Sequence, residues 1–175
     1  ASPQRSNVKR DKGTSQVNIL TIDFETYYAT DFSLTKLTTE EYIRDDRFEV
    51  IGVAVQVDDG KPEWFSGTHE DTKEWLQRFD WDNSFGLAHN AMFDAAILSW
   101  QFGIKPKGWF DTLAMARATE GMEVGNSLAK LAERYNLGVK GTEVLDAKGK
   151  RRLDMKPIEW LKYGEYCKND VKLTY

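Results

Sequence analysis

The stretch ILTIDFET, residues 19–26, has the pattern of a buried β-strand that carries two carboxylates. Side chains alternate between the two faces of a strand, so Asp23 and Glu25 share one face while apolar residues fill the other. Two anions held this close repel each other and resist losing water unless a cation lies between them. The pattern therefore indicates a divalent metal site, although edge strands also carry paired acids on a solvated face.

Two further pairs of polar side chains occur at helical spacing. Residues 86–98 read as a short apolar strand that runs into a helix, which places Asn90 and Asp94 on one helix face. Near the C-terminus, a second helical stretch puts Tyr166 and Asp170 at the same four-residue spacing. Taken alone, the first pair is also typical of a helix cap followed by a solvated acid, and the second of an ordinary surface contact.

The three motifs gain meaning from their order along the chain. A strand Asp-x-Glu, a strand-to-helix Asn-x-x-x-Asp and a helical Tyr-x-x-x-Asp resemble the DnaQ-like, or DEDD, superfamily of 3′→5′ exonucleases, in the subclass marked by the Tyr. The segments FDTL, residues 110–113, and SLAKLAERY, residues 127–135, support this resemblance, which spans residues 17–175. The segment TTEEYIRDDRFEVIG, residues 38–52, resembles the stretch after the first motif in proofreading domains of phage-type family A DNA polymerases.

The resemblance implies a ribonuclease-H-like α/β fold, a mixed sheet flanked by helices. The hydrophobic pattern agrees with it, because strands alternate with helices after an antiparallel hairpin. It predicts strands at 17–24, 49–57, 62–65, 85–88 and 109–110 and helices at 69–79, 90–102, 113–119, 127–135 and 157–175.

Domain organisation follows from the same pattern. Residues 1–16 are polar and lack a hydrophobic period, so we expect a flexible tail before one exonuclease domain at 17–175. The chain stops soon after the last motif without a helix-ending signal, and we expect a domain cut before a polymerase domain.

Composition limits the kind of site. At 175 residues and 41% hydrophobic, the chain can bury one real core. One cysteine and two histidines argue against a disulfide and against a Cys/His zinc site, so we expect any metal to be held by oxygen, which suits magnesium or manganese. The net charge of −4 is unusual for a protein that holds DNA by its phosphates, so metal ions would carry part of that attraction.

The sequence also bears on the location of the protein and on a possible contact with the phosphate backbone. No apolar run reaches membrane-spanning length and the N-terminus lacks a signal-peptide core, so we expect no membrane partner and a cytoplasmic location, in a bacterial host if the gene is phage-encoded. The densest basic stretch, KGKRR at residues 148–152, is typical of a phosphate-backbone contact or of a solvated charge run.

On the matched positions, the resemblance implies catalysis with two divalent cations, Mg²⁺ or Mn²⁺, spaced about 4 Å apart. Asp23 would bridge both ions, while Glu25 and Asp170 would bind the ion that carries the attacking water. Asp94 would hold the second ion through waters. Tyr166 would orient the attacking water, because a tyrosine with a pKa near 10 is mostly protonated at neutral pH.

The resemblance also implies the substrate contacts. Asn90 matches the residue that contacts the terminal nucleotide, and Thr26, Tyr27 and Tyr28 follow the first motif, where relatives can carry a bulky apolar wedge. Either tyrosine can stack on a base instead, which contributes about 1–3 kcal/mol. Asp111 is expected to satisfy backbone groups rather than to act as a fifth ligand.

The expected function is release of 5′-mononucleotides from a single-stranded or frayed 3′ end of DNA, as proofreading for a DNA polymerase. One alternative is an RNA 3′ exonuclease resembling ribonuclease D, because a 2′-hydroxyl contact leaves no trace in sequence. Others are a metal-binding domain without nuclease activity and a catalytically silent nucleic-acid-binding or scaffolding domain. The four intact acids argue against a silent domain, since acids repel phosphate.

Overall fold

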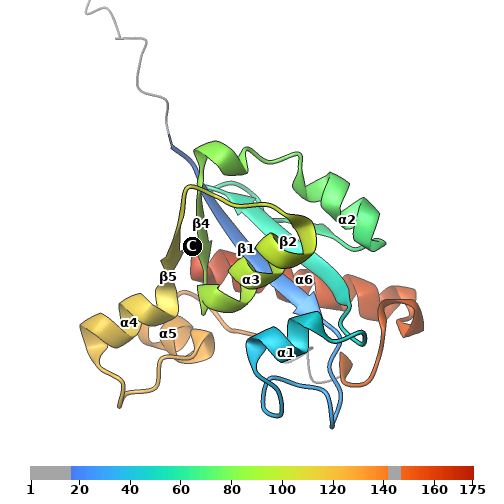
Figure 1. Cartoon of the computed structure of the whole chain (residues 1–175). Coiled ribbons are helices and arrows are strands. Elements are labelled where there is room, and N and C mark those ends of the chain that lie inside the picture. The colour runs from blue at the N-terminus through green and yellow to red at the C-terminus, as the bar shows by residue number, and fades with distance from the viewer. Residues whose placement is uncertain (1–16, 142–146) are drawn as a thin grey trace, which may run out of the picture.

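The structure is a computed structural model that describes residues 17–141 and 147–175. Within these ranges, five strands form one sheet in the order β3-β2-β1-β4-β5, with helices on both faces (Figure 1). The strands are β1 (Ile19–Thr26), β2 (Val50–Val57), β3 (Glu63–Phe65), β4 (Phe85–Ala88) and β5 (Gly108–Asp111). β1 pairs antiparallel with β2 and parallel with β4, which confirms the expected mixed sheet. The predicted tail at 1–16 lies outside the described residues.

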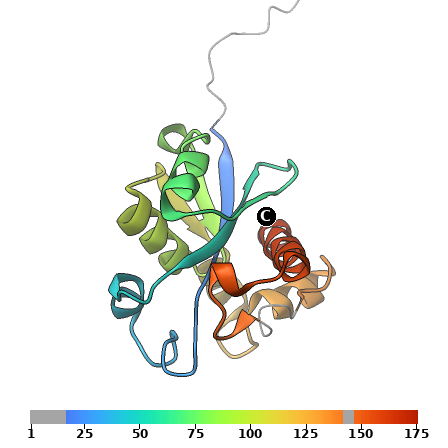
Figure 2. The same cartoon turned by 90° about the vertical axis from the view of Figure 1, so that its right-hand side faces the viewer.

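The helices form two layers with the sheet between them (Figure 2). α2 (His69–Leu76) and α3 (Ala91–Phe102) pack on one face, and α1 (Thr39–Arg44) lies against α3. α6 (Pro157–Thr174) packs on the other face along β1, β2 and β3. The remaining elements are the short turns η1 (Trp81–Asn83) and η3 (Arg152–Asp154) and the helices α4 (Thr112–Glu120) and α5 (Leu128–Tyr135), of which α5 contacts α6.

β1 divides its side chains between the two layers, as strand alternation requires. Leu20, Ile22 and Phe24 are buried in the main core with side chains of α2 and α3. Asp23 faces the opposite layer, where the thiol of Cys167 on α6 donates to it. The acidic face of β1 is therefore the face that α6 covers.

The predicted elements agree with the structure in order and type and differ at their ends. α2 stops at Leu76 rather than near Phe79, with Gln77 as its C-cap. The β2–β3 hairpin is confirmed, and α5 ends at Asn136, a C-cap in the left-handed conformation. α1 was not among the predicted helices because its six residues are too short for a periodic signal, although Thr38 and Glu41 form a capping box there.

Among the described residues, no helix combines the length and the apolar character that a bilayer crossing needs.

The contact between β3 and α6 depends on two glycines. Built at Gly164 of α6, a Cβ would lie 2.7 Å from the Cδ1 of Trp64, and at Gly52 of β2 a Cβ would lie 2.2 Å from the Cη2 of the same indole. The indole of Trp64 therefore lies against both glycines. The fit of α6 on the sheet therefore requires residues without side chains at these two positions.

We predict that Gly164→Ala destabilises the protein. The clash with Trp64 should cost about 1–3 kcal/mol, and the better helix propensity of alanine should return up to about 1 kcal/mol. Thermal denaturation should therefore show a lower Tm, whereas Glu165→Ala, on the exposed side of the same helix, should change little. A Gly164→Ala protein as stable as the parent would show that Trp64 can move aside.

Candidate metal centre

Four carboxylates from three elements converge beside the carboxyl-terminal half of β1. They are Asp23 and Glu25 from β1, Asp94 from α3 and Asp170 from α6. All are buried except Asp23, which is partly exposed. Asp23 interacts electrostatically with each of the other three, so it stands at the centre of the group. Residues predicted from three separate motifs thus form one acid cluster.

Asp94 reaches the cluster because β4 ends early. β4 pairs with β1 only as far as Thr21, and α3 begins beyond that point. There the Oδ1 of Asp94 accepts a hydrogen bond from the backbone N–H of Phe24 at 3.0 Å. The side chain replaces the missing strand partner and fixes α3 beside the acids of β1.

The chain turns from β4 into α3 at Asn90, whose φ of 71° is left-handed. Its backbone N–H donates to Asp111 Oδ1 at 3.0 Å, and the same oxygen accepts from the N–H groups of Leu113 and Ala114. Asp111 therefore satisfies backbone groups, as expected. Asn90 is the N-cap residue of α3, but its side chain makes no capping hydrogen bond and is exposed. The alternative of a solvated Asp94 is wrong, because Asp94 is buried.

α6 presents a stripe of residues to the acidic face of β1. Tyr163, Tyr166, Cys167 and Asp170 follow the spacing i, i+3, i+4, i+7 and are all buried. Sequence reasoning found two of them and missed Tyr163 and Cys167, although the helical period alone places all four on one face. The stripe brings two phenols, a thiol and a carboxylate to the acids of β1.

The two phenols remain protonated. Burial, followed by repulsion from the carboxylates, raises the pKa of Tyr166 far above its ordinary value, and Asp170 makes the largest contribution among these carboxylates. Burial and Glu25 raise the pKa of Tyr163 in the same direction. The hydroxyl of Tyr163 lies close to Glu25 but has no hydrogen bond of normal geometry among the described residues. Each hydroxyl is therefore a proton donor at neutral pH rather than a base.

Burial and mutual repulsion make the acids hard to ionise without a cation. Burial first, and then Asp170, raises the pKa of Asp23 to about 6. Burial and the charge of Asp23 raise the pKa values of Glu25 and Asp94 well above their ordinary range. A divalent cation among these oxygens would offset the repulsion, and carboxylate oxygens are the ligands that Mg²⁺ and Mn²⁺ prefer.

A lysine that the sequence analysis did not single out touches the cluster. The Nζ of Lys140 donates to the Oδ2 of Asp170 and lies 4.7 Å from the centre of the Tyr166 ring. The Oδ1 of Asp170 is buried and has no hydrogen-bond partner within the described ranges. One oxygen of Asp170 is thus neutralised by the chain itself, and the other is available to a further ligand.

The residues that follow the first motif are held by their neighbours. The hydroxyls of Thr26 and Tyr42 lie 2.9 Å apart, and Tyr42 also donates to the carbonyl of Tyr27. The guanidinium of Arg151 covers the ring of Tyr27 at 4.2 Å from its centre. Tyr28 is partly exposed. Of the two tyrosines expected to stack on a base, Tyr27 therefore already carries a cation on one face of its ring.

The basic stretch at 148–152 takes part in internal ion pairs. Lys150 pairs with Glu159 at 2.7 Å, and Arg151 pairs with Glu49 at 2.8 Å. These contacts fasten the segment before α6 to α6 itself and to the start of β2. For these two side chains, the structure favours a structural role over a phosphate contact.

Comparisons with known proteins identify a family for most of the chain. The family model described as "3′-5′ exonuclease" matches residues 38–175. No curated protein sequence matches the chain significantly.

Solved structures agree in fold. NrnC of Brucella melitensis bound to pGG has a TM-score of 0.63 and 18% identity, with 91% of this chain and 69% of that chain covered. The same protein has been solved with bound Mg²⁺. RNase D of Trypanosoma brucei in complex with RNA U12 has a TM-score of 0.64 and 18% identity, with 91% of this chain and 53% of that chain covered. The family B DNA polymerase of Pyrobaculum calidifontis has a TM-score of 0.63 and 17% identity, with 94% of this chain and 24% of that chain covered. These likenesses show the ribonuclease-H-like exonuclease fold.

We predict that the stability of the metal-free protein falls as the pH rises. The pKa of Asp23 is about 6 in the folded chain and 3.8 for an unperturbed aspartate, so at pH values between these two the folded state binds more protons than the unfolded state. The stabilisation is complete below pH 3.8 and is lost as the pH rises through about 6, and Glu25 and Asp94 act in the same direction. Thermal melts in EDTA should show this fall, and Mg²⁺ should raise the Tm most at high pH. A Tm in EDTA that stayed flat or rose over this range would contradict it.

We predict that Lys140→Met lowers stability without metal and increases the stabilisation by Mg²⁺. The change removes the cation paired with Asp170, which should cost about 1–3 kcal/mol in EDTA. It also removes a positive charge that would compete with Mg²⁺ for the carboxylate of Asp170. The rise in Tm on adding Mg²⁺ should therefore exceed that of the parent.

The control for this prediction is Lys130→Met, which breaks only the exposed pair with Glu133. It should leave both measurements unchanged. Equal Mg²⁺ responses in Lys140→Met and the parent would show that the Lys140 contact does not compete with metal binding.

Proposed function

The chain belongs to the family of 3′-5′ exonucleases, hydrolases that act on phosphodiester bonds, and on that premise we propose that it shortens DNA from a single-stranded or frayed 3′ end. The observation that carries the proposal is the convergence of four carboxylates beside a buried, protonated tyrosine. The products would be 5′-mononucleotides. The likeness of residues 38–52 to phage-type proofreading domains supports a role beside a family A DNA polymerase, in the cytoplasm of a bacterial host.

The residues present fit two divalent cations. Asp23, at the centre of the cluster, would bridge them, with Glu25 and Asp170 on one side and Asp94 on the other. The buried Oδ1 of Asp170, which lacks a partner among the described residues, is the atom that most clearly calls for a ligand. When bound, such ions lower the pKa of water and neutralise charge on the phosphorane-like transition state.

Tyr166 has a defined part in this arrangement. Its raised pKa keeps the hydroxyl protonated, so it cannot take a proton from water at neutral pH. It can hold a water molecule in line for attack by a hydrogen bond. Positioning of this kind needs a fixed side chain, and burial of the ring on α6 supplies it.

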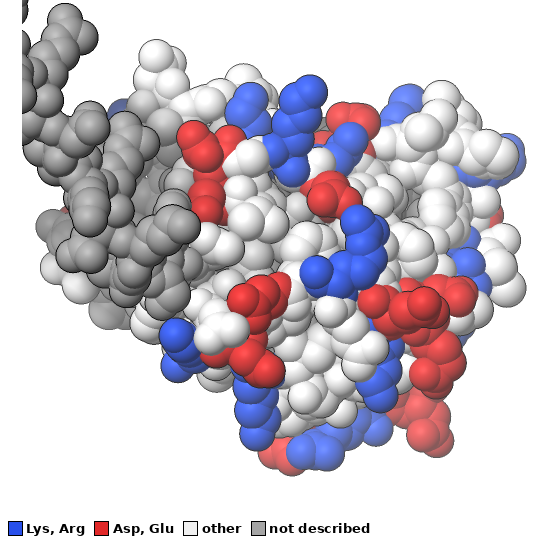
Figure 3. Space-filling model, turned by 90° about the horizontal axis from the view of Figure 1, so that it is seen from above, with Lys and Arg blue, Asp and Glu red and all other residues white. Residues whose placement is uncertain are grey.

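Substrate affinity would depend on the site more than on surface charge. On the face at which β1 begins, Lys and Arg are interleaved with Asp and Glu in the part that the structure describes, rather than forming one basic field (Figure 3). The acid cluster lies toward the other end of β1. With a net charge of −4, the protein would attract phosphate chiefly through cations bound at the cluster, while the exposed Asn90 contacts the terminal nucleotide.

The proposal predicts metal-dependent shortening from the 3′ end. Single-stranded DNA labelled at its 5′ end should give a ladder of shorter products with Mg²⁺ and none with EDTA, and Asp23→Asn should abolish the ladder while the fold persists. Asp46→Asn, at an exposed position, should leave the rate unchanged. The same assay is carried out in parallel on an RNA of the same sequence. Faster shortening of the RNA would replace DNA by RNA in the proposal, and activity in EDTA would refute it.

Tyr166→Phe removes one hydroxyl and leaves all four carboxylates in place. We predict that kcat falls by about 10²–10⁴-fold, the range for a positioned acid–base group, while metal binding persists. Tyr135→Phe, which removes a hydroxyl on α5 that donates to Glu120, should leave kcat unchanged. An unchanged kcat in Tyr166→Phe would remove this residue from the site.

A further inference from the structure

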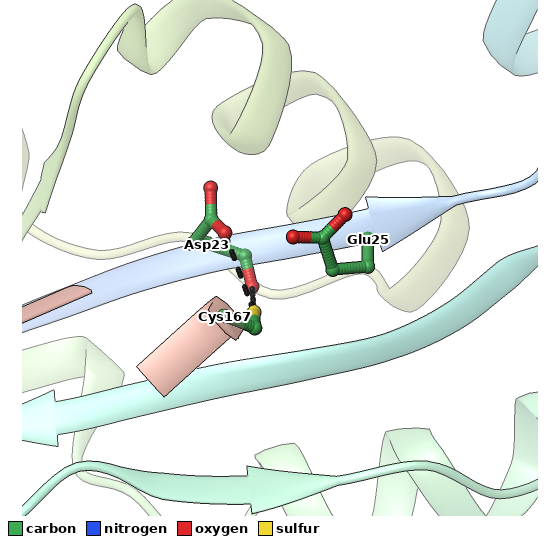
Figure 4. A group of neighbouring side chains, drawn as sticks. All are labelled: Asp23, Glu25 and Cys167. Carbon is green, nitrogen blue, oxygen red and sulfur yellow. Dashed lines mark hydrogen bonds between the residues drawn. The ribbon is translucent and has the colours of Figure 1, made fainter. Parts of the chain in front are cut away.

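The sheet becomes irregular at the end of β1, immediately after the first motif. Glu25 projects close to the end of the strand (Figure 4), and the pairing of β1 with β2 shifts register between Glu25 and Thr26. On its other side, β1 pairs with β4 only as far as Thr21. Beyond the shift, the backbone N–H of Tyr27 still donates to the carbonyl of Glu49 at 2.9 Å. Regular sheet pairing therefore does not fix the backbone at Thr26 and Tyr27.

Tyr42 of α1 supplies two hydrogen bonds at this point. Its hydroxyl donates to the carbonyl of Tyr27 at 2.5 Å and lies 2.9 Å from the hydroxyl of Thr26. A phenol has a single O–H proton, and here that proton goes to Tyr27. Thr26 must then donate to the oxygen of Tyr42. The two bonds form one chain that runs from Thr26 through Tyr42 to the backbone of Tyr27.

The hydroxyl of Tyr42 is held in place by the packing of its ring. Tyr42 is only 2% exposed, and its ring stacks on Phe32 at 4.5 Å and contacts Phe93 of α3 at 6.1 Å between ring centres. α1 is also tied to α3, because the side chain of Gln101 donates to the carbonyl of Ile43 at 2.8 Å. Burial raises the pKa of Tyr42 above its ordinary value, so the hydroxyl remains a donor.

Packing alone does not account for this hydroxyl. A phenylalanine would make the same ring contacts without a buried polar group that needs partners. Both partners of the hydroxyl belong to the segment 26–28, which we expect to contact the substrate. The polar group of Tyr42 is thus placed where it can order that segment.

We propose that Tyr42 is a positioning residue of the exonuclease, which fixes the backbone after the first motif in the conformation that receives the terminal nucleotides. The proposal rests on the proposed function, because Tyr42 would act through Thr26 and Tyr27 rather than touch the substrate itself. Holding these contacts in place before binding spares the substrate the cost of ordering them. Loss of the hydroxyl should therefore weaken substrate binding more than it slows the chemical step.

The test compares two variants that each lose one buried hydroxyl. Tyr42→Phe keeps the ring, and Ser84→Ala is the matched control, because the 1% exposed Ser84 donates to the carbonyl of Asp80 at 2.6 Å. Ser84 precedes β4 at the end of the sheet where Phe85 pairs with Ile19, far along β1 from Thr26. Circular dichroism and Tm establish that both variants are folded at the assay temperature.

Affinity for single-stranded DNA is measured by fluorescence anisotropy in Ca²⁺, under conditions in which the strand stays intact. We expect Tyr42→Phe to weaken binding at least about fivefold, the size of one lost hydrogen bond, and Ser84→Ala to bind like the parent. With Mg²⁺, KM should rise in Tyr42→Phe by a larger factor than kcat falls.

A second variant tests the same chain of hydrogen bonds without touching the core. Thr26→Val removes the other hydroxyl at a partly exposed position and should also weaken binding. Because Thr26 and Tyr42 act through one chain, the double variant should lose less affinity than the product of the two single effects. Losses that multiply would overturn the coupling.

The outcomes separate this proposal from the nuclease assignment. Unchanged affinity in folded Tyr42→Phe, or an equal loss in Ser84→Ala, would overturn the role of Tyr42 even if the nuclease were active. DNA binding that depends on the Tyr42 hydroxyl, without any cleavage in Mg²⁺, would support the role of Tyr42 and refute the proposed function. A parent protein that neither binds nor cleaves nucleic acid would refute both.

Discussion

Four carboxylates packed around one strand repel each other, and this repulsion is the constraint on which the rest of the structure depends. Asp23 lies at its centre, and burial raises the pKa values of Asp23, Glu25 and Asp94 instead of letting them ionise freely. Such a cluster is stable only with protons, an internal cation or bound metal ions. The fold therefore contains an unfavourable charge arrangement that a divalent ion would relieve, and in the proposed function the same carboxylates would be the metal ligands.

Each layer of the fold contributes to holding these charges in place. On one face, α3 is fixed to β1 by the hydrogen bond from Phe24 to Asp94. On the other, α6 fits the sheet through its glycine contact with Trp64 and brings the stripe from Tyr163 to Asp170 against the acids. Lys140 adds a cation from the segment after α5. The packing of α3 and α6 on the sheet is thus coupled to the electrostatics of the acid cluster.

The elements and the four acids could be predicted from sequence because each has a local signal: alternation on β1, helical spacing on α3 and α6. Lys140 could not, since its contact with Asp170 spans 30 residues without a motif. The neighbours of Cys167 could not be predicted either, because only folding brings α6 beside the carboxylates of β1. The contact between Arg151 and the ring of Tyr27 could not be predicted either, because only the tertiary structure brings these two residues together.

The central claim is that the acid cluster is a two-cation site organised around Asp23. Anomalous diffraction from crystals soaked in Mn²⁺ tests it most directly, because each peak locates an ion and its ligands without reference to activity. The account predicts two peaks about 4 Å apart, with Asp23 shared between them, Glu25 and Asp170 on one ion and Asp94 near the other. Peaks elsewhere on the protein, or a cluster without manganese at saturating concentration, would contradict it.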